Sequence, residues 1–389
     1  MNPRALFVAV GAATVNAACG SREQPRTPST RDSAGVVVVE NSIEKLPTWA
    51  VSSKPILRIG QENGPDAERF STVLAVAPMP DGGIAVADAS MEIRLFDSSG
   101  RHRTTFGGAG EGPGEFRTIG VFCQCAPNSI RVWDVQLRRE SQFRLDGTLE
   151  GTVDRRADSG DVSIIGFLPR ASLGLLDPLA NLAVSGALPD SSTLLRLDSA
   201  APVDTLFRIP TARRFVNLGA LTMEPFGPDL SVFASDSLLY WAFGSRFEIR
   251  THASDGSLRR ISRAHIVAAP IHESERKKYF DALGKGLPDA LRTRLVEAQS
   301  NVPFPKTYPV LDRILGGPNG IIWARLYSVG NDSREHWMVL DPEGKLVAQV
   351  RMPDGFACHA ITSRGILGVA SNDLGTQQVQ LLAVEKARF

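Results

Sequence analysis

The chain has 389 residues, of which 43% are apolar and 22% are charged, so it is long enough for two ordinary domains or one large all-β domain. Its 43 Lys and Arg residues balance 42 Asp and Glu residues. Proteins that bind nucleic acid or anionic membranes generally rely on an excess of basic residues, so this balance argues against both kinds of partner. Four cysteines are too few for a disulfide scaffold.

The first 18 residues have the features of a secretory signal peptide. Arg4 supplies a positive charge, residues 5–15 are mostly apolar, and two small residues, Ala17 and Ala18, follow. The apolar run is too short to cross a bilayer core of about 30 Å. We therefore predict a signal peptide over residues 1–18 and, because residues 19–35 are polar and contain two prolines, a flexible tether over 19–35.

The segment around Cys19 resembles the lipobox of bacterial lipoproteins, whose cysteine receives the acyl chains and becomes the mature N-terminus. Cys19 follows two alanines and precedes Gly20, although Asn16 stands where the family prefers an apolar residue. The resemblance implies that Cys19 is the lipid attachment site of an exported protein in the periplasm or at the outer membrane. Ordinary signal-peptidase cleavage near Ala17 or Ala18 is the alternative.

One pattern recurs along the rest of the chain: a turn, a short apolar strand, a second alternating strand, an Asp-Gly type of turn and a further strand. The spacings between copies are 46, 52, 57, 82 and 45 residues, close to the 40–50 residues of blade-type repeats except for the fourth. The apolar strand of each copy begins at Ile84, Ile130, Leu182, Leu239, Ile321 and Ile366. A strand preceding each of these is expected to be innermost, which gives four strands per repeat.

Six such repeats predict an all-β fold, a six-bladed β-propeller over residues 36–389. The last repeat lacks its fourth strand, and an unassigned strand lies at residues 55–60. We therefore expect this N-terminal strand to complete the last blade and close the ring, because an open ring would leave exposed strand edges. Residues 36–39 form a further strand whose partner the sequence does not assign.

The first repeat resembles an NHL repeat. The similarity rests on Val86-Ala87-Asp88, on residues 93–97 and on Gly112-Pro113-Gly114 before Phe116. The other five repeats share only the strand pattern. Over residues 36–389 the chain is similar to the six-bladed, NHL-like propeller lipoproteins of bacteria, a resemblance that implies a fold rather than a chemistry.

The long fourth spacing contains an insertion at residues 270–303. Two helices are expected there, at 273–283 and 287–299, the second with Leu287, Leu291 and Leu295 along one face. The insertion is expected to lie on a face of the propeller disk, either as a packed cap or as a lid or docking surface for a partner.

A few residues on the expected inner strands could line a central channel. Cys123 and Cys125 lie on one face of such a strand, and they could form a disulfide or supply two ligands to a soft metal. Cys358 and His359 lie on another inner strand and could complete such a site. Asp312 is an acidic channel candidate, as is Asp373. No residue can be assigned as catalytic, and no metal site or cofactor is predicted. Ca²⁺ or Zn²⁺ is a conceivable ligand of the channel, but no motif supports either ion.

These features favour a non-enzymatic, exported propeller that binds a protein or a small molecule at the cell envelope. We expect a monomer with no nucleic-acid partner, attached to the membrane only through its N-terminal lipid. The alternative is a propeller hydrolase or lyase that uses a metal ion at the central channel.

Overall fold

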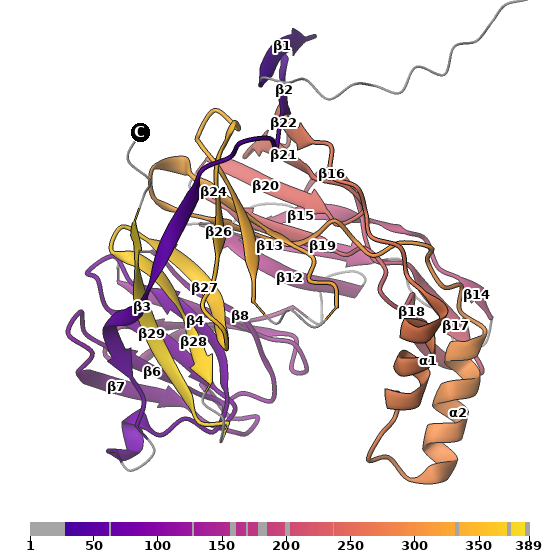
Figure 1. Cartoon of the computed structure of the whole chain (residues 1–389). Coiled ribbons are helices and arrows are strands. Elements are labelled where there is room, and N and C mark those ends of the chain that lie inside the picture. Colours follow the sequence, from indigo (N-terminus) through magenta and orange to yellow (C-terminus); the bar gives the residue numbers. More distant parts are fainter. Residues whose placement is uncertain are drawn as a thin grey trace, which may run out of the picture.

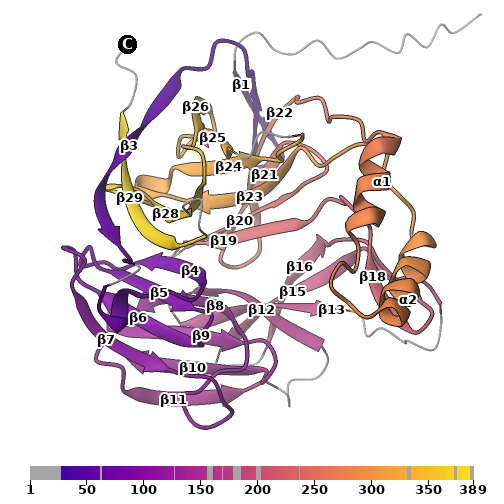
Figure 2. The ribbon, with the colours of Figure 1, turned by 60° about the horizontal axis from the view of Figure 1, so that its bottom comes forward.

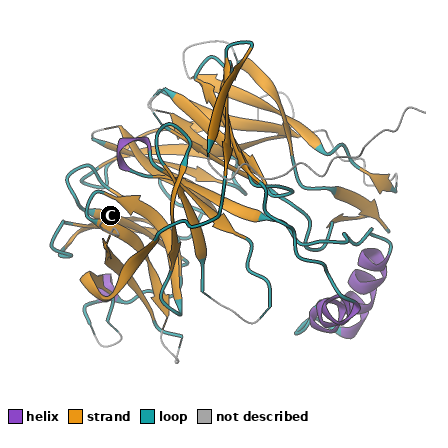
Figure 3. Ribbon diagram, turned by 45° about the horizontal axis from the view of Figure 1, so that its top comes forward, coloured by secondary structure: helices purple, strands orange, loops and turns teal. Residues whose placement is uncertain are grey.

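The computed structural model of this chain describes residues 28–61, 64–126, 128–155, 161–168, 170–177, 185–198, 203–235, 237–330, 334–371 and 375–385. The fold is all-β and propeller-like. Small twisted sheets lie beside one another, and the two α-helices lie together at one side (Figures 1 and 3).

Within the described residues, 24 strands form six antiparallel units of four strands each, and units 5 and 6 are joined into one eight-stranded sheet. Unit 1 contains β4 (Val73–Pro78), β5 (Ile84–Asp88), β6 (Glu92–Phe96) and β7 (His102–Gly107); unit 2 contains β8 (Ile119–Ala126), β9 (Ser129–Asp134), β10 (Arg139–Arg144) and β11 (Leu149–Asp154); unit 3 contains β12 (Asp161–Leu168), β13 (Ala171–Asp177), β15 (Ser191–Asp198) and β16 (Asp204–Pro210). Unit 4 contains β19 (Leu230–Ala234), β20 (Leu238–Phe243), β21 (Glu248–Ala253) and β22 (Leu258–Ala264); unit 5 contains β23 (Leu311–Gly316), β24 (Ile322–Leu326), β25 (His336–Leu340) and β26 (Leu346–Arg351); unit 6 contains β27 (Phe356–Thr362), β28 (Gly365–Ser371), β29 (Gln377–Glu385) and β3 (Thr48–Ile59).

The repeat pattern locates most of these strands, but it fails in unit 3. The sequence predicts that the second strand of this repeat begins at Leu182, which lies outside the described residues. In the structure that strand is β13, which pairs with both β12 and β15. The prediction was wrong because two apolar runs, residues 171–176 and 182–185, follow one another, and periodicity alone does not say which run pairs with β12.

The N-terminal segment joins three units. Strand β2 (Val36–Asn41) pairs in parallel with β22 of unit 4, which assigns the partner that the sequence left open. Strand β3 then pairs in parallel with β26 of unit 5 at Thr48 and Trp49, and antiparallel with β29 of unit 6 over most of its remaining length. In Figure 2 this indigo segment runs along the outside of units 4, 5 and 6.

The structure corrects the C-terminal part of the predicted tether. Residues 29–33, which were expected within it, form β1 (Ser29–Ser33), which pairs antiparallel with β2. Every residue of β1 is exposed. A polar sequence without apolar periodicity can form a strand here because β1 needs only the free edge of β2 and buries no side chains.

Asn41 fastens the N-terminal segment to unit 5. Its side chain is 2% exposed, its Nδ2 donates to the carbonyl of Gly344 at 3.0 Å, and its Oδ1 accepts from the amide of Leu346 at 2.8 Å. Both partners belong to the turn between β25 and β26 or to its end. One buried amide side chain therefore satisfies two backbone groups in a neighbouring unit.

Neighbouring units pack against each other through apolar side chains. One buried cluster combines Ile93 and Leu95 of unit 1 with Ile130 and Phe143 of unit 2. Another cluster joins units 6 and 1 and includes Ile59 of β3. The first strands of consecutive units touch one another, and β27 of unit 6 touches β4 of unit 1. Each sheet therefore buries its faces against its neighbours, which a single sheet could not do alone.

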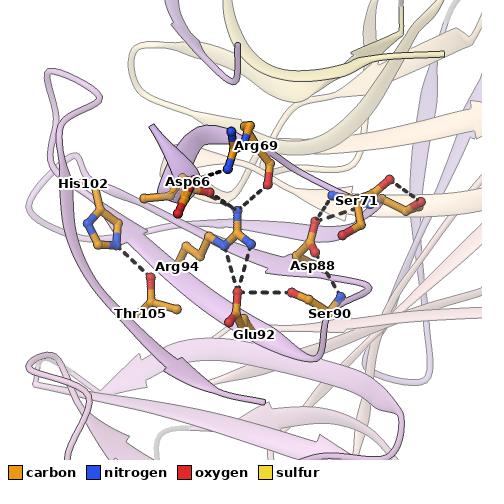
Figure 4. Close-up of polar contacts among 11 residues, drawn as sticks. Asp66, Arg69, Ser71, Asp88, Ser90, Glu92, Arg94, His102 and Thr105 are labelled. Carbon is orange, nitrogen blue, oxygen red and sulfur yellow. Dashed lines mark hydrogen bonds and ion pairs between the residues drawn. The ribbon is translucent and has the colours of Figure 1, made fainter. Parts of the chain in front are cut away.

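Unit 1 shows how polar side chains fix the turns between units (Figure 4). The guanidinium of Arg94 is bonded to Glu92, with an Nη2–Oε2 distance of 2.9 Å, and its Nη1 donates to the carbonyl of Arg69 at 2.7 Å, just after a short 3₁₀ helix, η1 (Asp66–Glu68). Asp88 ends β5, and its Oδ2 accepts from the backbone amide of Ser71 at 2.9 Å. The most NHL-like repeat therefore uses its charged residues to hold its own backbone.

The insertion contains the two predicted helices, α1 (Glu273–Ala282) and α2 (Asp289–Ser300). They pack beside a small sheet formed by β14 (Gly186–Ala187), β17 (Arg214–Asn217) and β18 (Ala220–Met223). Gln299 Nε2 of α2 donates to the carbonyl of Met223 at 2.9 Å. A second 3₁₀ helix, η2 (Pro318–Gly320), precedes β24. Among the described residues, no helix has the length and apolar character needed to span a membrane.

Candidate functional site

Two of the predicted site residues, Asp312 and His359, occupy β-bulges in the first strands of their units. Four of the six first strands carry a bulged residue that the β-ladder skips: Leu74 in β4, Ile165 in β12, Asp312 in β23 and His359 in β27. An extra residue in one strand bends it and redirects a side chain, which is why bulges often accompany binding sites. The sequence indicates the strands but not these bulges, because an inserted residue differs little from a normal alternation.

Three of the predicted channel residues meet between units 5 and 6. Asp312 binds the guanidinium of Arg325 through both carboxylate oxygens, at 2.7 and 3.1 Å. Glu335, just before β25, binds the same guanidinium at 2.6 Å and accepts from the amide of Cys358 at 2.9 Å. Asp312 is therefore engaged in an ion pair, and Cys358 and His359 lie beside this charged cluster.

Burial controls the protonation of His359 and Cys358. Desolvation lowers the pKa of His359 to about 4, and repulsion by Arg313 and Arg325 acts in the same direction. Desolvation raises the pKa of the Cys358 thiol well above its usual range, with the nearby Glu335 carboxylate adding to the effect. At neutral pH the imidazole is thus uncharged and the thiol is protonated, and a protonated thiol is a poor metal ligand.

The predicted pair Cys123 and Cys125 is described only in part. Cys123 is disulfide-bonded, which removes its sulfur from the possible thiolate ligands, whereas Cys358 is a free thiol. The side chain of Cys125 lies outside those that the structure describes, as do Cys19 and Asp373. Across the described ranges, no three His, Cys, Asp or Glu side chains are grouped in a way that could hold a metal ion.

A cleft of about 440 Å³ lies beside units 3 and 4 and the small sheet. Most of its wall is apolar, and Ile165, the bulged residue of β12, contributes to it. The polar side chains in the wall are Asp177, Thr211, Arg214, Asp229 and Ser231. A largely apolar cleft with a few polar groups is the usual form of a small-molecule site.

The polar centre of the cleft is an ion pair between Asp177 and Arg214. Asp177 ends β13, and its Oδ2 lies 3.0 Å from Nη1 of Arg214, the first residue of β17. The hydroxyl of Ser192 donates to the other carboxylate oxygen. Nε and Nη2 of Arg214 are buried and have no hydrogen-bond partner. Arg214 therefore retains donor capacity that the described residues do not use.

Sequence reasoning missed Asp177 and Arg214. Asp177 ends the second strand of its unit, as Asp88 and Asp134 do in units 1 and 2. In those units the aspartate holds backbone amides, Asp134 accepting from Arg117 at 2.6 Å. The repeated aspartate was therefore visible in the sequence, but the cleft depends on β17, which lies outside the repeat.

Comparison with known proteins supports the fold. No known family model and no curated protein matches this sequence. A Bacteroides fragilis protein described as exported aligns with a TM-score of 0.50 and 10% identity, over 87% of this chain and 99% of its own. A member of the DUF4221 family from Bacteroides vulgatus aligns with the same TM-score and identity, over 87% of this chain and 98% of its own. A gluconolactonase from Xanthomonas campestris aligns with a TM-score of 0.44 and 12% identity, over 88% and 99% of the two chains. At these identities the similarity concerns the propeller-like fold alone.

Proposed function

We propose that this chain is an exported, lipid-anchored, six-bladed propeller that binds a small ligand at the cell envelope without catalysing a reaction. The ligand site is the cleft around Asp177 and Arg214. The observation that carries the proposal is the combination of a volume of about 440 Å³, a mostly apolar wall and one ion pair, between Asp177 and Arg214. The expected ligand is partly apolar and carries a polar or ionised group.

The ring closure belongs to the same proposal. The six four-stranded units, the pairing of β3 with β29 and the contact between β27 and β4 support a closed ring of six blades. Closure also explains why the N-terminal segment passes along units 4 and 5 before it pairs with unit 6.

A substitution at the rim of the cleft tests the ligand site. Met223 lines the cleft and is 51% exposed, so a tryptophan there should narrow the cleft without disturbing a core. We expect apolar amino acids, dipeptides or medium-chain carboxylic acids that raise the melting temperature of the natural protein to lose this effect in Met223→Trp.

Leu221→Trp is the matched control. Leu221 lies two residues away on β18, is also 51% exposed and does not line the cleft. It should respond to the same compounds as the natural protein. An equal shift in all three proteins would refute binding in the cleft, and stabilisation by Ca²⁺ or Zn²⁺ alone would favour the metal-dependent hydrolase or lyase instead.

The membrane attachment requires a separate experiment. Cys19→Ala is expected to abolish incorporation of labelled palmitate and to move the protein from the membrane fraction to the soluble fraction of the envelope. Ser21→Ala, which leaves the cysteine in place, should behave as the natural protein. An unmodified mature N-terminus produced by cleavage near Ala17 or Ala18 would refute lipid attachment.

A further inference from the structure

We propose that Arg313 forms, with the neighbouring His359, a binding site for a small oxyanion, either a phosphate or a carboxylate. This site lies between β23 and β27 and is separate from the ligand cleft. It does not depend on the proposed ligand, because it rests on the charges and contacts of units 5 and 6.

Arg313 has no direct ion-pair partner among the described residues. Its Nη1 donates to the carbonyl of Cys358 at 3.1 Å, and the described residues place no carboxylate within ion-pair distance of its guanidinium. The two nearest acids, Asp312 and Glu335, are both bound to Arg325. The two carboxylates therefore compensate Arg325 first, and the charge of Arg313 remains without a close counterion.

Partial burial makes this charge costly. Desolvation lowers the pKa of the Arg313 guanidinium, and repulsion by Arg325 lowers it further. A positive group that is partly removed from water and repelled by a second cation is stabilised by an anion at short range. The site is therefore better suited to an anion than to a cation or a metal ion.

The hydrogen-bonding groups of the two side chains suit an oxyanion. A guanidinium presents parallel N–H groups that match two oxygens of a carboxylate or a phosphate. His359 occupies the bulge of β27, and its neutral ring can donate one hydrogen bond without bringing a further positive charge. Both side chains are partly exposed, and no nitrogen of Arg313 belongs to the fully buried, unpartnered atoms, so an ion can reach them.

The position of the site relates it to the cleft. The backbone amide of Ile314, the residue after Arg313, donates to the hydroxyl of Ser231 at 2.9 Å, and Ser231 lines the cleft. The bound oxyanion could thus be a free ion or the acidic group of a larger molecule.

Histidine-selective ¹⁵N labelling makes the test simple, because the chain contains six histidines. Inorganic phosphate, acetate and chloride are added separately at equal ionic strength to the full mature protein. We expect phosphate or acetate to shift the ring signals of His359, assigned through His359→Gln, while chloride leaves them in place. A response to phosphate alone would identify a phosphate site, and a response to acetate alone would identify a carboxylate site.

Variants establish the role of Arg313. Arg313→Gln should weaken binding of the responding anion by about tenfold or more, and Arg313→Lys should weaken it less because the charge is kept. Arg58→Gln removes an exposed arginine of β3 and should leave binding unchanged. Met223→Trp should also leave it unchanged, which separates this site from the ligand cleft. An equal shift with chloride, or equal losses in Arg313→Gln and Arg58→Gln, would overturn the proposal, and the first of these results needs only the natural protein.

Discussion

Deletion of residues 54–60 is expected to abolish cooperative folding. All of these residues except Gly60 belong to β3, whose loss would leave β29 as an unpaired edge and expose the cluster that joins units 6 and 1. The thermal transition followed by circular dichroism should disappear or fall far below that of the mature protein. Deletion of residues 29–33, which are all exposed, should leave the transition nearly unchanged.

Two single substitutions in β3 measure the same effect without removing a strand. Ile59 is 1% exposed and Ile56 is 51% exposed. Ile59→Ala should lower the free energy of unfolding by about 2–5 kcal/mol, the usual cost of deleting a large buried side chain. Ile56→Ala should change it by less than about 0.5 kcal/mol. If Ile59→Ala and the deletion both melted like the natural protein, the pairing of β3 with β29 would not stabilise the fold, and the proposed ring closure would be wrong.

The sequence predicts the strands of this fold better than it predicts their partners. Turns and apolar alternation are local signals, so β5 begins at Ile84, as the sequence predicts. The pairing of β2 with β22 joins residues about 220 positions apart, and no local signal encodes it. Asn41 looks like an ordinary polar residue until the turn of unit 5 is placed against it. Short apolar runs that compete for one partner, as around Leu182, are ambiguous for the same reason.

The candidate sites show a related limit. Asp312, Cys358 and His359 lie on β23 and β27, the first strands of units 5 and 6, and the structure brings them close to one another. Their chemistry depends on Arg313, Arg325 and Glu335, which the sequence offered no reason to select. Whether a guanidinium pairs with a carboxylate or repels another cation depends on distances of a few ångströms between units. Such distances follow from packing rather than from spacing along the chain.

The second large effect is expected at Glu140, which connects units 2 and 3. Its carboxylate is 6% exposed, binds the guanidinium of Arg131 and accepts from the hydroxyl of Ser172 at 2.6 Å. Arg131 also donates to the carbonyls of Leu168 and Ala171, each at 3.0 Å. Glu140→Ala should lower the free energy of unfolding by about 3–5 kcal/mol, because it leaves a buried guanidinium without its counterion.

The comparison with an exposed pair makes this prediction specific. Glu150 binds Arg144 at 2.9 Å at the surface, so Glu150→Ala should leave the denaturant midpoint close to that of the natural protein. Replacing both members of the buried pair, in Arg131→Met with Glu140→Leu, should cost less than Glu140→Ala alone, since the Arg131 guanidinium is removed together with its carboxylate. Arg155, whose Nη2 lies 3.5 Å from Oε2 of Glu140, loses this contact equally in both proteins. Chemical denaturation of the four proteins decides the matter. If Glu140→Ala and Glu150→Ala gave equal midpoints, the buried pair would not hold units 2 and 3 together, and the apolar contacts between their faces would account for that interface by themselves.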